Sequence, residues 1–300
     1  MSEAQAAAET AAHHAPSAGE YINHHLTNWG NQMHTGIVDF SVIHYDSVFW
    51  AVATGLFGVV FLWSVTRKAT SGVPGRLQAA IEILFEMVDT QAKSLVHNEA
   101  SRRFVAPVAL TVFIWVFLMN AVDFLPLDLL PGGWARINEV IGHDAHHAYM
   151  RPVATADLSI TMGLSVSVLL LCLYYNLKIK GVGGWAHELV SAPFGSSKNP
   201  LLAVVMAIVN FSMQMIEFAA KTISHGMRLF GNMFAGELIF MLIAMLGGAW
   251  AASGSTAALW VVHVVLGLAW TLFHVLVIPL QAFIFMMLTL VYLGQAHDAH

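Results

Sequence analysis

Two apolar stretches near the C-terminus, 200–247 and 257–293, constrain this chain most, because each is far longer than the ~20 residues that a bilayer requires. As one helix, the first would be about 70 Å long against a hydrocarbon thickness of about 30 Å, so it must tilt steeply or break. Possible bends lie at Gly226, Gly231, Gly236 and Pro279. We expect two long, tilted helices packed antiparallel as a hairpin. Splitting each stretch into two short spans is the alternative.

The rest of the chain also has the composition of an integral membrane protein. It is 57% hydrophobic and 10% charged, whereas a soluble domain is about 25% charged. The pattern predicts one all-α membrane domain over 36–300, in which spans at 48–66, 105–125 and 157–177 precede the two long helices. The modest net charge of -5 and the lack of a basic, aromatic-rich tract argue against nucleic acid as a partner.

Between the first two spans, residues 74–98 have the pattern of an amphipathic helix. Apolar residues recur at gaps of three and four, at Leu77, Ile81, Leu84, Phe85, Val88, Ala92 and Leu95. The other face carries charged side chains. We expect this helix to lie along the cytoplasmic membrane surface, with packing against a partner subunit as the competing explanation.

The first 35 residues are rich in Ala and His and lack Lys and Arg. Because they have neither the basic region nor the apolar core of a signal peptide, we expect a retained, flexible periplasmic tail. Histidines gather here and in the loop after the second span, at His13, His14, His24, His25, His143, His146 and His147. Nothing in the sequence fixes their geometry, and Cys172 is the single cysteine, so we expect no metal site, cofactor or disulfide.

The distribution of basic residues predicts the topology. Placing the loop after the first span inside puts most of them in the cytoplasm, namely Arg67, Lys68, Arg76, Lys93, Arg102, Arg103, Lys178, Lys180 and Lys198. Only Arg136 and Arg151 then lie outside. This bias favours a periplasmic N-terminus, five crossings and a cytoplasmic C-terminus, although splitting both long stretches would also end inside.

Ionisable residues inside the first long stretch are the strongest functional signal. Arg228 cannot shed its proton, and a charged side chain at the bilayer centre costs from a few up to roughly 15 kcal/mol, so such residues normally mark a pathway. Gaps of three or four residues predict one polar stripe of Asn210, Gln214, Glu217, Lys221, Ser224, Arg228 and Asn232. Glu237 comes after Arg228 in the chain and points roughly to the opposite side of the helix. It must therefore serve a different face.

The last stretch mirrors this stripe, because His263, His274 and Gln281 share one face of a helix. Carboxylates, histidines and amides at such spacing suit chains of water and protons better than a bulky solute. A structural alternative remains, in which Glu217 and Lys221 simply neutralise each other as an i,i+4 pair. His225 is adjacent to the stripe, and its structural interpretation is a core histidine. Asp123 and Asp128, beside helix-stopping prolines, are expected to face a membrane exit.

At these residues the chain resembles a known family. MRLFGNMFAGELIF (227–240) and LQAFIFMMLTLVYL (280–293) are similar to signature segments of the a subunit of bacterial F-type ATP synthases, the membrane stator that faces the rotating c-ring. KATSGVPG (68–75), FIWVFLMNAVDFLPLDLLP (113–131) and LKIKGVGG (177–184) also look like that family. The resemblance covers nearly the whole chain from Asp46 onward.

The resemblance implies a role for each matching residue. Arg228 corresponds to the essential arginine that faces the c-ring carboxylates, and Gln281 approaches it from the last helix. Glu237 and His274 match the periplasmic half-channel, to which Asn232, Asn120, Asp123 and Asp128 are plausible contributors. On the cytoplasmic side Lys221 and Ser224 fit the pattern. Gln214 stands where a carboxylate is expected, while Glu217 brings one a turn closer to Arg228, which leaves open which residue handles the proton there.

The function implied is a non-catalytic, proton-conducting stator subunit with two offset half-channels separated by Arg228. Its partners would be the c-ring, the subunit b peripheral stalk and the whole F-type complex, with H⁺ translocated across the bacterial inner membrane bilayer. A self-contained proton-coupled secondary transporter is the alternative. That class is expected to show repeated halves and broken helices around a solute site, and no internal repeat is visible in the sequence.

Overall fold

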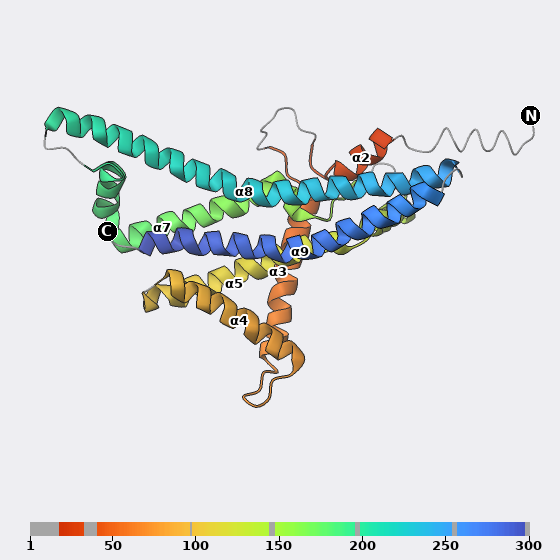
Figure 1. The fold of residues 1–300 in the computed structure, drawn as a ribbon, viewed down its shortest axis with the longest axis horizontal. Coiled ribbons are helices and arrows are strands. Elements are labelled where there is room, and N and C mark those ends of the chain that lie inside the picture. The colour runs from red at the N-terminus through yellow and green to blue at the C-terminus, as the bar shows by residue number, and fades with distance from the viewer. Residues whose placement is uncertain are drawn as a thin grey trace, which may run out of the picture. The chain divides into compact units, whose positions relative to one another are not determined.

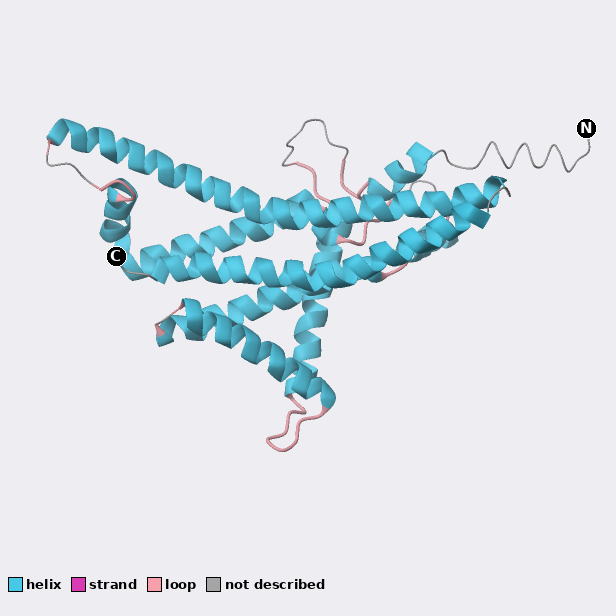
Figure 2. Ribbon diagram, in the orientation of Figure 1, coloured by secondary structure: helices cyan, strands magenta, loops and turns pink. Residues whose placement is uncertain are grey.

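The computed structural model describes residues 18–32, 41–96, 98–143, 148–195, 199–253 and 257–297. These residues form helices joined by loops, with no strand beyond an isolated bridge between Gly30 and His44 (Figure 2). The expected all-α fold is therefore confirmed. The chain divides into two compact units, described separately below: unit 1 holds 1–50, 122–154 and 235–274, and unit 2 holds 51–121, 155–234 and 275–300.

Five helices among the described residues are long and apolar enough to cross a membrane. They are α3 (Tyr45–Thr66), α5 (Glu99–Ala121, extended by the 3-10 helix η1, Val122–Phe124), α7 (Leu158–Ser191), α8 (Pro200–Ser253) and α9 (Ala257–His297). Each covers one of the predicted spans. The expectation of five crossing helices is confirmed, while their tilt in a bilayer stays a prediction.

Both long apolar stretches form single helices. Helix α8 has 54 residues and α9 has 41, so the alternative of four short spans is wrong. In unit 1 the helices lie side by side, because Nδ1 of His263 in α9 is 2.7 Å from the carbonyl oxygen of Ile243 in α8. In unit 2 they are joined again by Lys221 and Gln295, whose Nζ and Oε1 atoms are 3.0 Å apart. The two helices run antiparallel within each unit, as predicted.

Two of the glycines expected as bends instead allow close contacts. In unit 2, a Cβ added to Gly226 of α8 would lie 2.7 Å from Sδ of Met162 and 3.2 Å from the carbonyl oxygen of Thr161, both in α7. In unit 1, a Cβ on Gly236 would overlap the His274 ring of α9. Glycine at these positions lets α8 approach its neighbours without breaking its own hydrogen bonds.

The amphipathic helix is α4 (Arg76–Leu95), which packs against α5 (Figure 1). Ile81, Val88 and Ala92 from its predicted apolar face are buried. Leu77 and Phe85 from the same face remain exposed. The helix itself is confirmed. Its place on the membrane surface, or against a partner subunit, stays a prediction.

Three helical segments are not predicted by the sequence pattern. Within the expected flexible tail, Ala18–Leu26 form helix α2. Residues 1–17 and 33–40 lie outside the described residues. Leu129–Ile141 form helix α6, in which Pro131 falls in the first turn, where its missing N–H is tolerated. The helix of the predicted span 157–177 continues past its expected end to Ser191, with a kink at Gly181, whose φ of 68° favours glycine.

Candidate functional site

Glu237, in the part of α8 that belongs to unit 1, forms a buried ion pair with Arg151. The carboxylate is 3% exposed and Arg151, in the loop before the 3-10 helix η3 (Ala154–Ala156), is 5% exposed. Nε and Nη2 of Arg151 both donate to Oε2 of Glu237, at 3.0 and 2.5 Å. A buried carboxylate is tolerated where an opposite charge and hydrogen bonds replace water, and this guanidinium supplies both.

The backbone of Arg151 is held in place by Asp46 at the start of α3. The buried Asp46 carboxylate accepts the backbone N–H of Arg151 at 2.9 Å. It also accepts the backbone N–H groups of Trp29 at 3.0 Å and Ser47 at 2.8 Å. Three segments of unit 1 therefore converge on one carboxylate, and this arrangement fixes the loop from which Arg151 reaches Glu237.

His274 of α9 faces Asp123 of η1, also in unit 1. Nε2 of His274 is 3.2 Å from Oδ2 of Asp123, within ion-pair distance but not aligned for a hydrogen bond. The imidazole is 1% exposed. It lies against Gly236 and among the rings of Phe240 and Trp270, at centroid distances of 4.9 and 5.3 Å. Two of the predicted periplasmic residues are thus in direct contact with each other.

A small cavity of about 20 Å³ lies beside these groups. Its lining includes Glu237, Asp123 and His25, the last of which comes from α2. A space of this size is enough for about one water molecule. Two acids and an imidazole therefore share a site in which one water could bridge them and pass a proton between them.

Asp128, the N-cap residue of α6, takes part in a separate contact with α2. Its Oδ1 accepts from the Tyr21 hydroxyl at 3.2 Å and lies 3.0 Å from Nε2 of His25. Burial of the phenol, and then the neighbouring Asp128 carboxylate, raise the pKa of Tyr21 from 10.0 to about 12. Asp128 thus ties the N-terminal helix to the start of α6.

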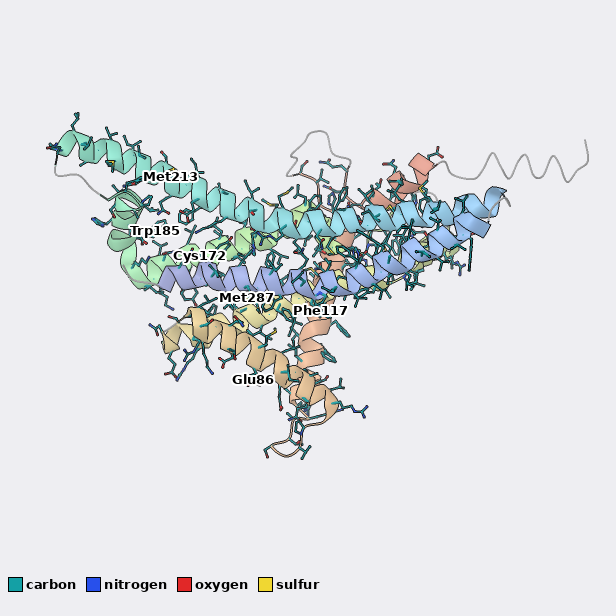
Figure 3. All side chains as sticks on the ribbon, in the orientation of Figure 1. Glu86, Phe117, Cys172, Trp185, Met213 and Met287 are labelled. Carbon is teal, nitrogen blue, oxygen red and sulfur yellow. The ribbon has the colours of Figure 1, made fainter. Side chains whose placement is uncertain are left out.

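Unit 2 contains a larger cavity of about 260 Å³ between α7, α8 and α9. Figure 3 labels two of its lining residues, Cys172 and Trp185, both on α7. Gln214, Glu217 and Lys221 of α8 also line it. Nζ of Lys221 is 2.6 Å from Oε1 of Glu217 and 3.0 Å from Oε1 of Gln295. The predicted i,i+4 pair is formed, and it borders a cavity with both polar and apolar lining residues rather than a packed core.

Asn210 of the expected polar stripe and His225, which is adjacent to the stripe, are both buried. Asn210 is fully buried and donates from Nδ2 to the carbonyl oxygens of Val190 and Gly195, so it fastens α8 to the end of α7 and the turn after it. His225 is also buried, with its ring stacked on Phe285 at a centroid distance of 3.7 Å. Neither ring nitrogen of His225 has a hydrogen-bond partner among the described residues. The members of the stripe that line the cavity are therefore Gln214, Glu217 and Lys221.

Arg228 lies on an exposed face of α8. Among the described residues, its guanidinium forms no salt bridge or hydrogen bond. Ser224, one turn earlier, is exposed as well, while Asn232 and Gln281 are half-buried. Asn120 of α5 is fully buried and accepts the Thr155 hydroxyl at 2.7 Å. The predicted residues thus range from buried to exposed and do not form one continuous line.

Comparison with known proteins identifies the family to which this chain belongs. A family model described as ATP synthase A chain matches residues 48–294. The chain belongs to this family. ATP synthase subunit a of Paracidovorax citrulli (strain AAC00-1) is 63% identical over 287 residues, which cover 96% of this chain and 98% of that protein. Subunit a of Verminephrobacter eiseniae (strain EF01-2) is 62% identical over the same shares, and that of Psychrobacter arcticus (strain DSM 17307 / VKM B-2377 / 273-4) is 43% identical over 92% and 96%.

Membership of the ATP synthase A chain family confirms the resemblance seen in the sequence. Together with the five long apolar helices, it identifies a multi-pass membrane protein that is a subunit of an ATP synthase. All predicted site residues lie within the matched range. Helix α2 precedes that range, and Gln295 follows it by one residue.

Arg151 and His25 are the residues of this A chain that the sequence pattern did not identify as part of the site. Arg151 had one signal, since the predicted topology places it outside against the usual bias of basic residues. His25 had none, because it is one of many histidines in an N-terminal segment of simple composition. No group of three metal-binding side chains lies together within the described ranges. His13, His14, His146 and His147 lie outside those ranges.

Proposed function

We propose that this chain is the proton-conducting stator subunit of an F-type ATP synthase, with Arg228 facing a carboxylate of the c-ring. The observation that carries the proposal is the state of Arg228 on its membrane-spanning helix. Its permanent charge is exposed and has no salt bridge or hydrogen bond among the described residues. An unpaired guanidinium in an apolar environment is costly, so an anionic partner from another subunit must meet it in the assembled complex.

The two groups of ionisable residues serve as half-channels in this proposal. Glu237, His274 and Asp123 belong to the periplasmic one, where the cavity of about 20 Å³ admits a bridging water. Gln214, Glu217, Lys221 and Ser224 belong to the cytoplasmic one, which includes the cavity of about 260 Å³. Asn120, Asp128, Asn232 and Gln281 are assigned supporting positions along these routes.

Arg228 separates the two routes electrostatically. It favours the ionised form of a nearby carboxylate, so a protonated c-ring acid must release its proton before it passes. Each charge that crosses is worth about 2.3 kcal/mol per 100 mV, and a continuous water path would dissipate this energy without rotation. The chain itself is non-catalytic in this scheme, and it works with the c-ring and the subunit b peripheral stalk in the bacterial inner membrane.

A self-contained secondary transporter is not favoured. Such proteins place their solute site at broken membrane helices, whereas α8 and α9 are each continuous over their described residues. The proposed orientation, with the N-terminus periplasmic and the C-terminus cytoplasmic, rests on the basic residues of the sequence.

Cysteine cross-linking tests the assignment of the Arg228 face. Gly231 shares that face, is exposed, and has open space where a Cβ would be added. Gly231→Cys should therefore cross-link to cysteines placed beside the c-ring carboxylate in the assembled complex. Leu229→Cys, at a buried position of the same helix, is the matched control and should not react. Cross-linking through Leu229→Cys but not Gly231→Cys would exclude this orientation.

A further inference from the structure

Helix α2 contributes a histidine to the wall of the Glu237 cavity. His25, in the last turn of α2, lines this cavity together with Asp123 and Glu237. Its imidazole is 10% exposed, whereas the Asp128 side chain that it contacts is 71% exposed. The His25–Asp128 pair therefore connects the aqueous surface of unit 1 to the buried cavity. Because α2 precedes residue 48, it lies outside the range matched by the family.

Both ring nitrogens of His25 lie within hydrogen-bond distance of oxygen acceptors. Nδ1 is 3.0 Å from the carbonyl oxygen of Tyr21, and Nε2 is 3.0 Å from Oδ1 of Asp128. A carbonyl oxygen and an ionised carboxylate can only accept hydrogen bonds, whereas a neutral imidazole has a single N–H to donate. Both bonds form together only when both ring nitrogens carry a proton. Two oxygen acceptors therefore face the two ring nitrogens, an arrangement that only a ring with two N–H groups satisfies in full.

Loss of one proton from His25 breaks this arrangement. A neutral ring would turn a nitrogen lone pair toward one of the two oxygen acceptors, and that bond would be lost. Histidine is the side chain that ordinarily changes charge between about pH 5 and 8. The titratable or charged groups around His25 are Tyr21 and His24 on α2, Asp128 at the start of α6, Asp123 in η1, and Glu237 on α8 with its partner Arg151.

We propose that His25 is a pH-dependent positioning residue for proton uptake, which in its protonated form holds α2 and Asp128 at the mouth of the Glu237 cavity. The inference rests on the proposed function, in which Glu237 lies on the periplasmic route. In acid surroundings the docked pair links bulk water to the cavity. In alkaline surroundings α2 is released, and proton entry slows because this link is lost.

The first test measures docking of α2 without relying on proton transport. In the whole complex in nanodiscs, with Cys172→Ser, spin labels are attached to Asn23→Cys on α2 and Ile137→Cys on α6, both exposed. Pulsed electron paramagnetic resonance measures the distance between the two labels. This distance should have one narrow distribution at about pH 5 and a broad one at about pH 8, where a histidine is ordinarily neutral. His25→Gln should remove this difference. The same distribution at both pH values in the parent protein would overturn the inference.

Two further variants keep the test decisive. His24→Gln changes the neighbouring histidine, whose ring contacts the Tyr149 ring, so it should keep the pH dependence. His25→Lys retains a cation at both pH values and should stay docked at both. A His25→Lys protein that is released at about pH 8 like the parent would show that His25 is not the titrating group.

The second test measures transport in proteoliposomes that contain the whole complex. ATP synthesis is driven by acid–base jumps in which the pH on the Glu237 side is varied at a constant proton gradient. The parent rate should fall as this side becomes alkaline, and His25→Gln should lose that pH-dependent step. If His25→Gln keeps the parent profile while Arg228→Ala stops synthesis, the inference is wrong and the proposed function stands. If Arg228→Ala leaves synthesis intact, the proposed function is wrong.

Discussion

At the scale of single residues, the buried acid Glu237 is balanced by an arginine from a distant loop. Arg151 reaches Oε2 of Glu237 with two nitrogen atoms, and its own backbone N–H is bound by Asp46. Arg228, in contrast, has no such bond among the described residues. The two arginines therefore differ in their surroundings: Arg151 stabilises the fold around the acid, whereas the proposed function assigns to Arg228 a contact with another subunit.

The ion pair leads to a stability prediction. Arg151→Gln leaves the Glu237 carboxylate buried without its cation and should destabilise the chain by about 3–5 kcal/mol. Adding Glu237→Gln should recover much of this loss, because the second change removes the unpaired charge. Thermal unfolding of the purified complex provides the measurement, and exposed Arg136→Gln is the control. Additive effects of the two changes would contradict the pairing.

Gly236 allows a second prediction at this scale. Gly236→Ala places a methyl group on the His274 ring and should destabilise the protein by about 1–3 kcal/mol, the usual cost of overpacking. It should also displace the imidazole from Asp123 and slow proton flux. Gly267→Ala is the matched control, since its added Cβ would meet Ile243 at an ordinary 3.7 Å. Equal unfolding midpoints for the two variants would show that this close contact is not a constraint.

At the scale of elements, periodicity and apolar length predict the membrane helices well. The five spans and the amphipathic α4 follow from those signals because burial in lipid or against a neighbour demands them. Helix α6 could not be predicted in this way, since Pro131 and two glycines give its segment the composition of a turn. Helix α2 has nine residues and is held by contacts with Asp128, which lies more than a hundred positions further along the chain.

The candidate site was only partly predictable for the same reason. Spacing along one helix identifies Glu217 with Lys221, which do pair. Spacing cannot identify Arg151 as the partner of Glu237, because the two come from a loop and a helix that are far apart in the sequence. Nor can it show that Asn210, in register with the polar stripe, serves to hold the end of α7.

The docking of α2 predicts an alkaline transition. The pKa of Tyr21 is about 12 when α2 is docked and 10.0 when the phenol is free. Between these values the released phenol loses its proton first, so this contribution to docking is present below pH 10 and is lost as the pH approaches 12. The measurement is made in His25→Arg, which keeps a cation beside Asp128 at alkaline pH and should leave α2 docked, as the difference in tyrosinate absorbance between this protein and its Tyr21→Phe derivative. Asp128→Asn should lower the midpoint, and a midpoint near 10 in His25→Arg would contradict the contact.

At the scale of the whole molecule, the ionisable residues of this ATP synthase subunit are divided between its two compact units. Each compact unit contains its own ionisable groups and cavity, with Glu237 and His274 in one and Glu217 and Lys221 in the other. Helices α8 and α9 contribute residues to both. Neither cavity explains the exposed charge of Arg228, which the proposed function assigns to the boundary between the two routes.

ATP-driven proton pumping by a complex that carries Arg228→Ala tests the proposed role of this arginine. We expect that pumping is abolished while ATP hydrolysis continues, because the variant removes the barrier between the routes and leaves the catalytic sites of the complex intact. Glu237→Gln should slow pumping less severely, since water and His274 can partly substitute for the acid. Pumping by Arg228→Ala at close to the parental ratio of protons to ATP would show that Arg228 does not separate the two routes.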